Sequence, residues 1–383
     1  MENFISSNPS MFSIKPKDNI MTVKLDYVWL DGHTQKNLRS KIRFEEIKLN
    51  SKETLNLKDI PRWSFDGSST QQASSDNSDL ILKPVKVAKN PLSSKNENYD
   101  SFIVLCEVLD TDGKPHNTNT RHALGKLKKN DIIFSAEQEY TLLDARTVRP
   151  LGWPKSPEGE TIFPLPQARY YCGTGDFVKG RNFIDKYMNM LVDAGLNVRG
   201  SNAEVMLSQW EYQLGNINAV DLADELWISR YIIERLSEYF GMIISWEPKP
   251  IPGDWNGSGC HFNFSTKKMR DGGYDEKYAS VILDKLEEDH FTHIRYCGLG
   301  NENRLTGEHE TCHMSEFKHG VGDRSASVRI PAACVKGDNF YMEDRRPAAN
   351  CDPYEVLLSL SKSIVSGHEE LNSLKGQEVE VVA

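Results

Sequence analysis

The sequence lacks the features that mark several common classes of protein. No stretch approaches the roughly 18 consecutive apolar residues of a membrane-spanning helix. Acidic residues outnumber basic ones, 55 against 46, and the net charge of −9 argues against a nucleic-acid binder, which would carry a basic surface. No Gly-x-x-x-x-Gly-Lys-Ser/Thr segment is present, so a P-loop is excluded. We therefore expect no membrane and no nucleic acid as partners.

The 7 cysteines argue against a disulfide framework. Their number is odd and none lies in a Cys-x-x-Cys pair, which favours free thiols in a reducing compartment. The N-terminus has no basic segment followed by an apolar one, so we expect no secretory signal and a cytoplasmic location. An organellar signal is disfavoured by the early Glu2 and by the absence of Arg from residues 1–20.

The 383 residues are enough for two or three domains. Short β-forming runs at residues 23–30, 39–47 and 102–109 alternate with polar loops. A cluster of turn residues at 110–115 then suggests a domain boundary. We predict an N-terminal extension over residues 1–22, a small β-rich domain over residues 23–110, and a catalytic domain over residues 111–383.

The second region mixes helices and strands. Apolar spacing predicts helices over residues 118–129, 181–193, 221–240, 276–291 and 353–365. Strands are predicted over residues 134–143, 209–214, 242–246, 259–265, 326–330 and 340–345. Many of these elements are joined by hairpin-length connections or loops, so an α+β domain is favoured over a doubly wound sheet.

Two acidic residues on one predicted strand are the most informative local feature. Glu137 and Glu139 lie two residues apart within a run of β-forming residues, so their side chains share one face of the strand. Carboxylates held that close favour a hard cation such as Mg²⁺ or Mn²⁺, which takes oxygen ligands. The alternative is an exposed strand face with two solvated acids.

Three further predicted strands repeat this arrangement, with polar, ligand-type side chains on one face. The polar faces carry Glu211 between Gln209 and Gln213, then His261 with Asn263 and Ser265, then Tyr341 with Glu343 and Arg345. Any one would be a solvated face by default, but four together favour a site. Glu204 precedes Glu211 by an odd spacing, so the two converge only if the chain bends near residues 207–208; otherwise Glu204 is a surface residue.

Arginines and one aspartate complete the candidate set. The last third of the chain carries Arg304, Arg324, Arg329, Arg345 and Arg346. Guanidinium groups match carboxylate and phosphate oxygens, so these residues suggest a site for a metal-bound polyphosphate and an anionic substrate, against the alternative of surface ion pairs. Residues 61–70 have the composition of a turn, which is either a tight loop with no further role or a segment that presents Asp66.

Nearly the whole chain, from Tyr27 to Tyr354 and beyond, resembles the shorter, eukaryotic-type form of the glutamine synthetase family. The matching runs are long, numerous and in family order. They are Trp63 to Thr70, Glu137 to Leu142, Asn202 to Met206 with Gln209 to Glu211, Lys249 to Gly253, Gly259 to His261 with Asn263 to Thr266, Asn303 to Gly307 with His309 to Thr311, Arg324 to Ser327 with Arg329 to Pro331, and Glu343 to Pro347. One departure is Leu207, which stands where a proline is usual.

The resemblance implies a ligase that joins glutamate and ammonium, with ATP as co-substrate, through a γ-glutamyl phosphate. It implies two to three Mg²⁺ or Mn²⁺ ions per site. Glu139, Glu204 and Glu211 would hold one ion, and Glu137, His261 and Glu343 would hold the second, which bridges to the ATP phosphates. The implied fold is an N-terminal β-grasp domain plus a catalytic α/β domain with a curved antiparallel sheet.

The resemblance also implies roles for the remaining residues. Arg324 and Arg329 would neutralise the transferred phosphoryl group, and Glu310 matches the glutamate of a flap that closes over the site. Asp66 matches the acid that takes a proton from ammonium in a neighbouring subunit of a decamer built from two pentameric rings. Glutamate would be bound by Arg304 and Arg345 with Asp254, Trp255, Gly257 and Arg324, and ATP by Glu137, Glu211, Asn263, Ser265, Arg324, Arg329 and Tyr341.

Two other readings stay open at this point. A ligase of the same fold could use a different amine, as γ-glutamyl-polyamine ligases do, although Asp66 and Glu310 favour ammonium. A structural relative could have lost catalysis, as lens proteins of this family have, but such a protein would lack ligands, and every expected acid, His and Arg is present.

Overall fold

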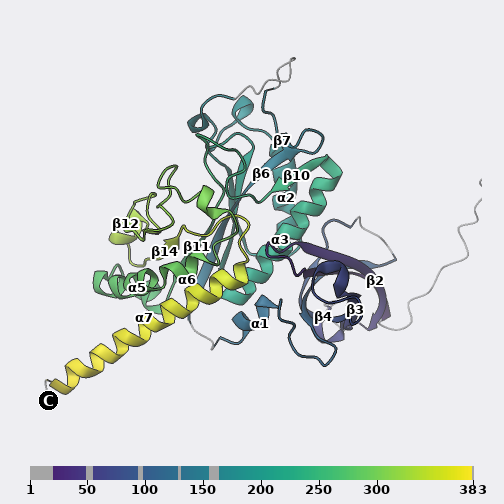
Figure 1. Cartoon of the computed structure of the whole chain (residues 1–383), viewed down its shortest axis with the longest axis horizontal. Coiled ribbons are helices and arrows are strands. Elements are labelled where there is room, and N and C mark those ends of the chain that lie inside the picture. Colours follow the sequence, from purple (N-terminus) through teal and green to yellow (C-terminus); the bar gives the residue numbers. More distant parts are fainter. Residues whose placement is uncertain (1–19, 49–54, 94–97, 128–130, 155–163, 382–383) are drawn as a thin grey trace, which may run out of the picture.

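The structure is a computed structural model that describes residues 20–48, 55–93, 98–127, 131–154 and 164–381, with side chains described as far as residue 370. Two β-sheets carry the fold. Figure 1 shows the smaller, N-terminal sheet (purple to blue) beside a larger body that holds the second sheet and most of the helices. This is the predicted α+β architecture.

The N-terminal sheet has the strand order β2-β1-β5-β4-β3. Its strands are β1 (Ile20–Leu30), β2 (Leu38–Lys48), β3 (Trp63–Asp66), β4 (Asp79–Lys89) and β5 (Asp100–Leu109), and only the β1–β5 pairing is parallel. Alternation along β1 divides its buried residues between two cores. Leu25, Tyr27 and Trp29 pack inside the small domain, whereas Val28 packs with the main core, so this sheet is fixed against the body on one face.

The larger sheet runs in the order β12-β13-β14-β11-β6-β9-β8, with β7 and β10 also paired to β6. Its strands are β6 (Ile133–Asp144), β7 (Arg149–Pro150), β8 (Val198–Ala203), β9 (Gln209–Ile217), β10 (Met242–Ser245), β11 (Cys260–Ser265), β12 (His319–Val321), β13 (Val328–Ile330) and β14 (Met342–Asp344). All pairings except β12–β13 are antiparallel. Strand β6 therefore lies near the centre, flanked by β11 and β9.

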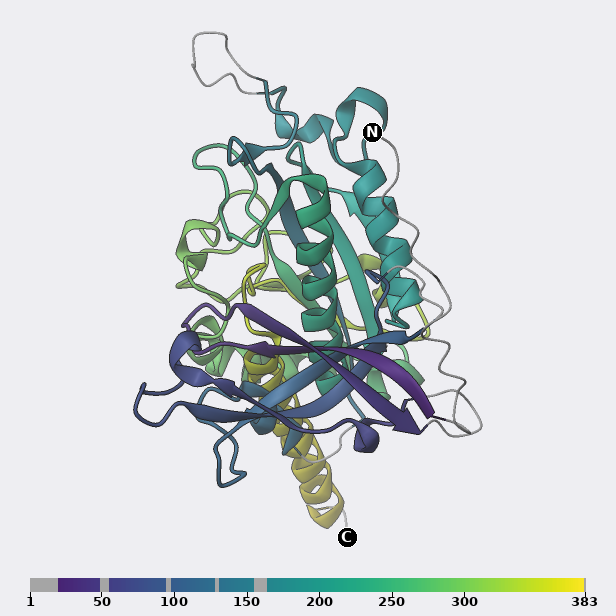
Figure 2. The ribbon, with the colours of Figure 1, turned by 90° about the vertical axis from the view of Figure 1, so that its right-hand side faces the viewer.

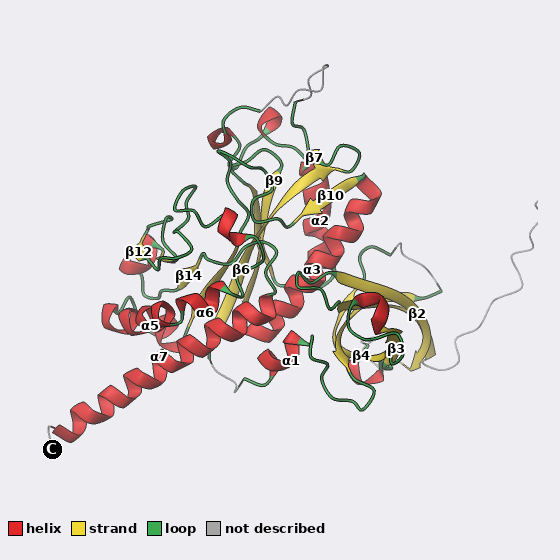
Figure 3. Ribbon diagram, in the orientation of Figure 1, coloured by secondary structure: helices red, strands yellow, loops and turns green. Residues whose placement is uncertain are grey.

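Helices cover one face of this sheet. They are α1 (Thr120–Gly125), α2 (Arg181–Asp193), α3 (Ala219–Phe240), α4 (Lys267–Asp271), α5 (Glu276–Glu288), α6 (His290–Ile294) and α7 (Pro353–Val381). Figure 2 shows α2 and α3 side by side across the sheet, and Figure 3 shows α7 extending beyond the body. Asn218 caps the start of α3 by accepting a hydrogen bond from the backbone N–H of Asp221, and Gly241 ends the helix with a φ of 60°.

Most predicted elements are confirmed, and the differences have local causes. The turn predicted over residues 61–70 is wrong in part, because Trp63–Asp66 form β3, a strand too short to show a period. Strands β4, β7, β8 and β12 were not predicted. In β4, Pro84 interrupts the β-forming run at an irregularity in the pairing. Helix α1 is shorter than residues 118–129, the helix predicted over 276–291 is divided into α5 and α6, and α7 runs past residue 365.

The predicted N-terminal extension falls largely outside the described residues, and its last part, residues 20–22, belongs to β1. Among the described residues, no helix is both long enough and apolar enough to cross a membrane.

The chain bends between β8 and β9 at a strained residue. Ser208 has a φ of 74°, in the left-handed region that favours glycine, although it is 3 % exposed. Its carbonyl accepts a hydrogen bond from the N–H of Leu142 (3.0 Å), which holds the bend against β6. Its hydroxyl is buried without a hydrogen-bond partner among the described residues. The bend is therefore held by tertiary contacts rather than by local preference.

We predict that Ser208→Gly raises the free energy of unfolding by about 1 kcal/mol, because it removes the left-handed strain and an unpaired hydroxyl. Ser361→Gly is the matched control, since Ser361 is also buried with an unpaired hydroxyl but lies inside helix α7. That change should lower the free energy by about 0.5 kcal/mol. Urea unfolding midpoints measure both, and equal destabilisation by the two changes would show that Ser208 is not strained.

Candidate active site

The register of the central strands decides which side chains meet at the site. Glu137 on β6 lies beside His261 on β11, and Glu139 lies beside Glu211 on β9. Both acids point to the same face of the sheet, as their spacing predicts. This face lies away from the helices, since Gln138 between them accepts a hydrogen bond from Arg230 on α3. Each acid therefore has a different neighbour, and two separate clusters form along one strand.

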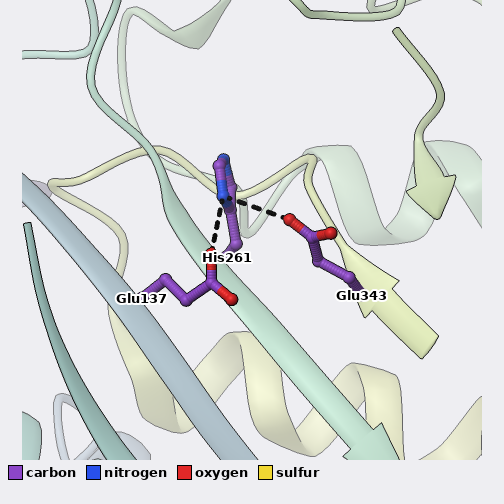
Figure 4. Close-up of side chains that lie close together, drawn as sticks. All are labelled: Glu137, His261 and Glu343. Atoms are coloured by element: carbon purple, nitrogen blue, oxygen red, sulfur yellow. Dashed lines mark ion pairs between the residues drawn. The ribbon is translucent and has the colours of Figure 1, made fainter. Parts of the chain in front are cut away.

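The first cluster consists of Glu137, His261 and Glu343. Their ligand atoms lie within 4.8 Å of one another. The Nδ1 atom of His261 lies 3.7 Å from a carboxylate oxygen of Glu137 and 3.5 Å from one of Glu343, as Figure 4 shows. The same atom is buried and has no hydrogen-bond partner among the described residues.

This cluster fits a divalent cation. Burial and the nearby Arg345 hold the pKa of His261 well below its usual range, so the imidazole is neutral, as a metal ligand must be. Two carboxylates and one neutral imidazole are a donor set that suits Mg²⁺ or Mn²⁺. The unpaired Nδ1 between two carboxylates is the observation that supports a cation here rather than a direct hydrogen bond.

The second cluster consists of Glu139, Glu204 and Glu211, again with ligand atoms within 4.8 Å. Asn202 donates to Glu204 (2.8 Å), and Gln213 donates to Glu211 (2.8 Å). Burial raises the pKa of all three carboxyl groups, and repulsion between neighbouring acids raises them further. Three acids in this position are stable as carboxylates only with a cation between them, so this cluster also fits a divalent ion.

Glu204 reaches this cluster because the β8–β9 hairpin reverses the chain. Glu204 follows the end of β8, Glu211 lies on β9, and Ser208 forms the bend between them. The chain thus bends where the odd spacing between Glu204 and Glu211 requires it, so the two residues converge. The alternative that Glu204 is only a surface residue is wrong.

The arginines differ in how their charges are balanced. Glu343 is 1 % exposed and accepts hydrogen bonds from Arg329 (2.7 Å) and Arg345 (2.5 Å). Arg304 is also buried, yet its guanidinium donates to backbone carbonyls of residues 345 and 346 and approaches Nε2 of His261 at 3.0 Å. Arg324 is exposed and makes no ion pair among the described residues. Arg304 and Arg324 therefore keep positive charge for a ligand.

The loop that carries Glu310 is strained. His309 and Glu310 are consecutive residues with φ values of 52° and 61°, although neither is glycine. His309 lies 3.5 Å from the carboxylate of Asp254 and 3.4 Å from the side-chain amide of Gln167. Left-handed residues in sequence cost free energy and persist where surrounding contacts hold them, which is common in loops that move at functional sites.

Most candidate residues line one cavity of about 320 Å³. It is lined by both acidic clusters except Glu343, and by Gly257, Arg304, Glu310, Arg324, Arg329 and Arg345. A second cavity of about 330 Å³ adjoins it at Glu137 and Gln213, and is lined by Asn263, Ser265 and Tyr341. The two cavities together follow β6 along the face that carries its acids.

Three predicted residues lie elsewhere. Asp254 is almost fully exposed, and Trp255 packs on Trp153 with ring centroids 4.8 Å apart. Asp66 lies in the N-terminal sheet and lines neither cavity, and hydrogen bonds from Ser69 and Ser68 lower its pKa to about 2. Residues not predicted as ligands also line the cavities, above all Asn202, Gln209, Gln213, His309 and Arg199.

Comparisons with known proteins show which family this chain resembles. Residues 117–278 match the family model described as glutamine synthetase, catalytic domain. A chloroplastic glutamine synthetase of Chlamydomonas reinhardtii is 43 % identical over 89 % of this chain and 90 % of its own. The glutamine synthetase of Saccharomyces cerevisiae is 42 % identical over 93 % of this chain and 92 % of its own. The solved structure of Plasmodium falciparum glutamine synthetase matches the fold with a TM-score of 0.71 at 19 % identity, covering 93 % of this chain and 74 % of that one.

The raised pKa values of the second cluster predict how stability depends on pH. Because the folded state holds protons that the unfolded state releases, stability without metal should fall as pH rises above the ordinary carboxyl pKa. In EDTA, we expect the melting temperature to drop by about 5 °C or more between pH 5.5 and 8.5. Added Mn²⁺ should reverse the drop, with its largest effect at pH 8.5.

Glu211→Gln tests the source of this slope, because it removes one of the three acids. The variant should show a flatter pH dependence in EDTA, whereas Glu238→Gln, at an exposed site on α3, should keep the wild-type slope. A slope that Glu211→Gln leaves unchanged would show that the cluster does not cause it.

Proposed function

This chain belongs to the glutamine synthetase family, and from that premise we propose how its residues carry out the reaction. Its activity is the ATP-dependent condensation of glutamate and ammonium to glutamine. The observation that carries the proposal is the pair of metal-type clusters on one face of β6, joined to unpaired arginines in a single cavity. These are the groups that a phosphoryl transfer to a carboxylate needs.

We assign Glu139, Glu204 and Glu211 to the ion on the glutamate side, and Glu137, His261 and Glu343 to the ion on the nucleotide side. When bound, Mg²⁺ or Mn²⁺ ions at these sites would neutralise charge on the phosphates and on the carboxylate under attack. The hydrogen bonds from Arg329 and Arg345 fix the orientation of Glu343, and Asn263 fixes Glu137 by donating to it (2.8 Å).

The arginines would act on the two anionic substrates. Arg304 is buried and has no carboxylate partner within hydrogen-bond distance among the described residues, so it suits a carboxylate of glutamate. Arg345 would assist it, and Gly257 would line the same site, since it lies against the side chain of Arg304. Asp254 and Trp255 precede Gly257 in the chain and would support this loop. Arg324 and Arg329 would stabilise the transferred phosphoryl group, which spreads negative charge over its oxygens.

The reaction requires two further functions, which are protection of an intermediate from water and removal of a proton from ammonium. The γ-carboxylate of glutamate is a poor electrophile, so it is first converted to γ-glutamyl phosphate, which water would hydrolyse. We propose that the strained loop with His309 and Glu310 closes over this intermediate. Ammonium must lose a proton before it can attack. Hydrogen bonds from Ser69 and Ser68 lower the pKa of Asp66 to about 2, so the carboxylate is ionised and would bind the ammonium ion and accept this proton as the C–N bond forms.

Asp66 would act in the site of a neighbouring subunit. In its own chain it is exposed and lines neither cavity. The same domain exposes Ile42 (48 %) and Phe44 (55 %) on strand β2, which suits contact with another copy. We therefore propose a decamer of two pentameric rings.

We also propose a domain boundary between β5 and α1. The proposed location is cytoplasmic, although one relative is named as chloroplastic.

We predict that Glu139→Ala lowers the rate of ATP-dependent glutamine formation by at least about 100-fold, because it removes a metal ligand. Glu238→Ala, at an exposed site, should keep the wild-type rate. Initial rates with Mg²⁺ and ammonium, then with ethylamine or putrescine, measure this. Retained activity in Glu139→Ala would overturn the ligand assignment, and turnover with another amine but not with ammonium would overturn the proposed substrate.

Mixed oligomers test the proposed position of Asp66. If Asp66 serves the neighbouring site, refolding equal amounts of inactive Asp66→Ala and Glu139→Ala chains together should restore about a quarter of the wild-type activity, since random pairing makes that share of interfaces intact. Mixtures that stay as inactive as the separate variants would show that Asp66 acts within its own chain.

A further inference from the structure

The second cavity contains a charged residue that none of the assignments above uses. Arg199 lies on β8 and lines the 330 Å³ cavity that adjoins the active-site cavity. Of the charged residues that line it, Glu137 belongs to the first cluster, and Arg199 is the other. Resting on the proposed binding of ATP, we propose that Arg199 recognises the nucleobase of the nucleotide.

Two β-bulges aim Arg199 at this cavity. Val198 pairs with Leu214 and Gly200 with Gln213, so Arg199 is the extra residue on β8. Strand β9 has its own irregularity, where Asn216 adopts a φ of 62°. A bulge turns a side chain out of the regular alternation, and bulges are frequent beside active sites. Two bulges at one edge of this cavity therefore point to a functional site there, and this geometric argument does not depend on the charge of Arg199.

The guanidinium is held in place and still has free donors. Its Nε and Nη2 atoms both donate to the carbonyl of Gly215, at 3.0 and 2.9 Å. Its Nη1 atom makes no hydrogen bond with the described residues, and the residue is exposed. An arginine anchored in this way presents a flat cationic surface and free N–H groups at little cost in conformational entropy.

Position along the sheet separates the base from the phosphates. Gly215, which anchors Arg199, pairs with Ser135, two residues beyond Glu137 along β6. The proposed phosphate site lies at Glu137, so Arg199 acts about 7 Å further along the cavity. The lining there mixes apolar and polar side chains, with Ile133 beside Ser135, Asn216 and Ser265, whereas Phe134, Leu214 and Phe264 are almost fully buried in the core behind it. A planar base can stack on the guanidinium and accept hydrogen bonds from its N–H groups, and the polar groups of the lining can meet the edge of the base.

Direct binding measurements with Mg²⁺ present test the proposal. Arg199→Ala should weaken ADP binding by about 5–30-fold and leave tripolyphosphate binding unchanged. It should raise the KM for ATP by a similar factor and leave the KM for glutamate unchanged. Arg199→Lys keeps the charge but not the flat surface, so it should lose less affinity than the alanine variant. Arg146→Ala, at an exposed site in the turn between β6 and β7, is the control.

The outcomes separate this inference from the proposed function. If the wild-type protein binds ADP and Arg199→Ala binds it equally well, the inference is wrong and the proposed function stands. An equal loss of affinity for ADP and tripolyphosphate would also overturn it, because Arg199 would then act on phosphate. A similar rise in both KM values would indicate a structural role instead. Failure of the wild-type protein to bind ADP at all would overturn the proposed function with it.

Discussion

Repulsion among carboxylates on one face of the central sheet is the constraint on which the site depends. Strand alternation places Glu137 and Glu139 on the same face of β6, and antiparallel pairing brings His261 to one side of it and Glu211 to the other. Burial makes this arrangement costly, as the raised pKa values of Glu139, Glu204 and Glu211 show. The fold must supply rigid pairing on both flanks of β6 to hold these groups together.

The register then determines function. Because His261 lies beside Glu137 and Glu211 beside Glu139, two acids on one strand serve different clusters. Paired arginines stabilise Glu343 from the other side, while Arg304 and Arg324 keep charge for substrates. Strain is stored next to these groups, at Ser208 in the hairpin and at His309 and Glu310 in a loop that lines the cavity. The site is therefore held by strand pairing where the acids lie and is strained where the chain bends.

Much of this follows from periodicity in the sequence. The faces of β6 and β11 were predictable, since Glu137, Glu139 and His261 alternate with buried residues, all of them apolar except Gln138. The convergence of Glu204 with Glu211 was not, because it depends on the hairpin bend at Ser208, and serine gives no signal for a left-handed conformation. Strand β3 was hidden by the turn residues around it.

Other features arise only from tertiary structure. No strand was predicted around Arg199, and only the bulge in β8 reveals that this residue lines a cavity. The balance of charge among the arginines is equally invisible, because it depends on partners that can be distant in sequence, as Glu343 is from Arg329. The role proposed for Asp66 depends on a second chain, so neither the sequence pattern nor a single subunit can place it.

Anomalous X-ray diffraction from crystals soaked in Mn²⁺ tests the central claim most directly. Separate clusters predict two distinct Mn²⁺ peaks, one bounded by Glu137, His261 and Glu343 and the other by Glu139, Glu204 and Glu211. A single peak shared by Glu137 and Glu139 would contradict the claim, because the two acids would then bind one ion together.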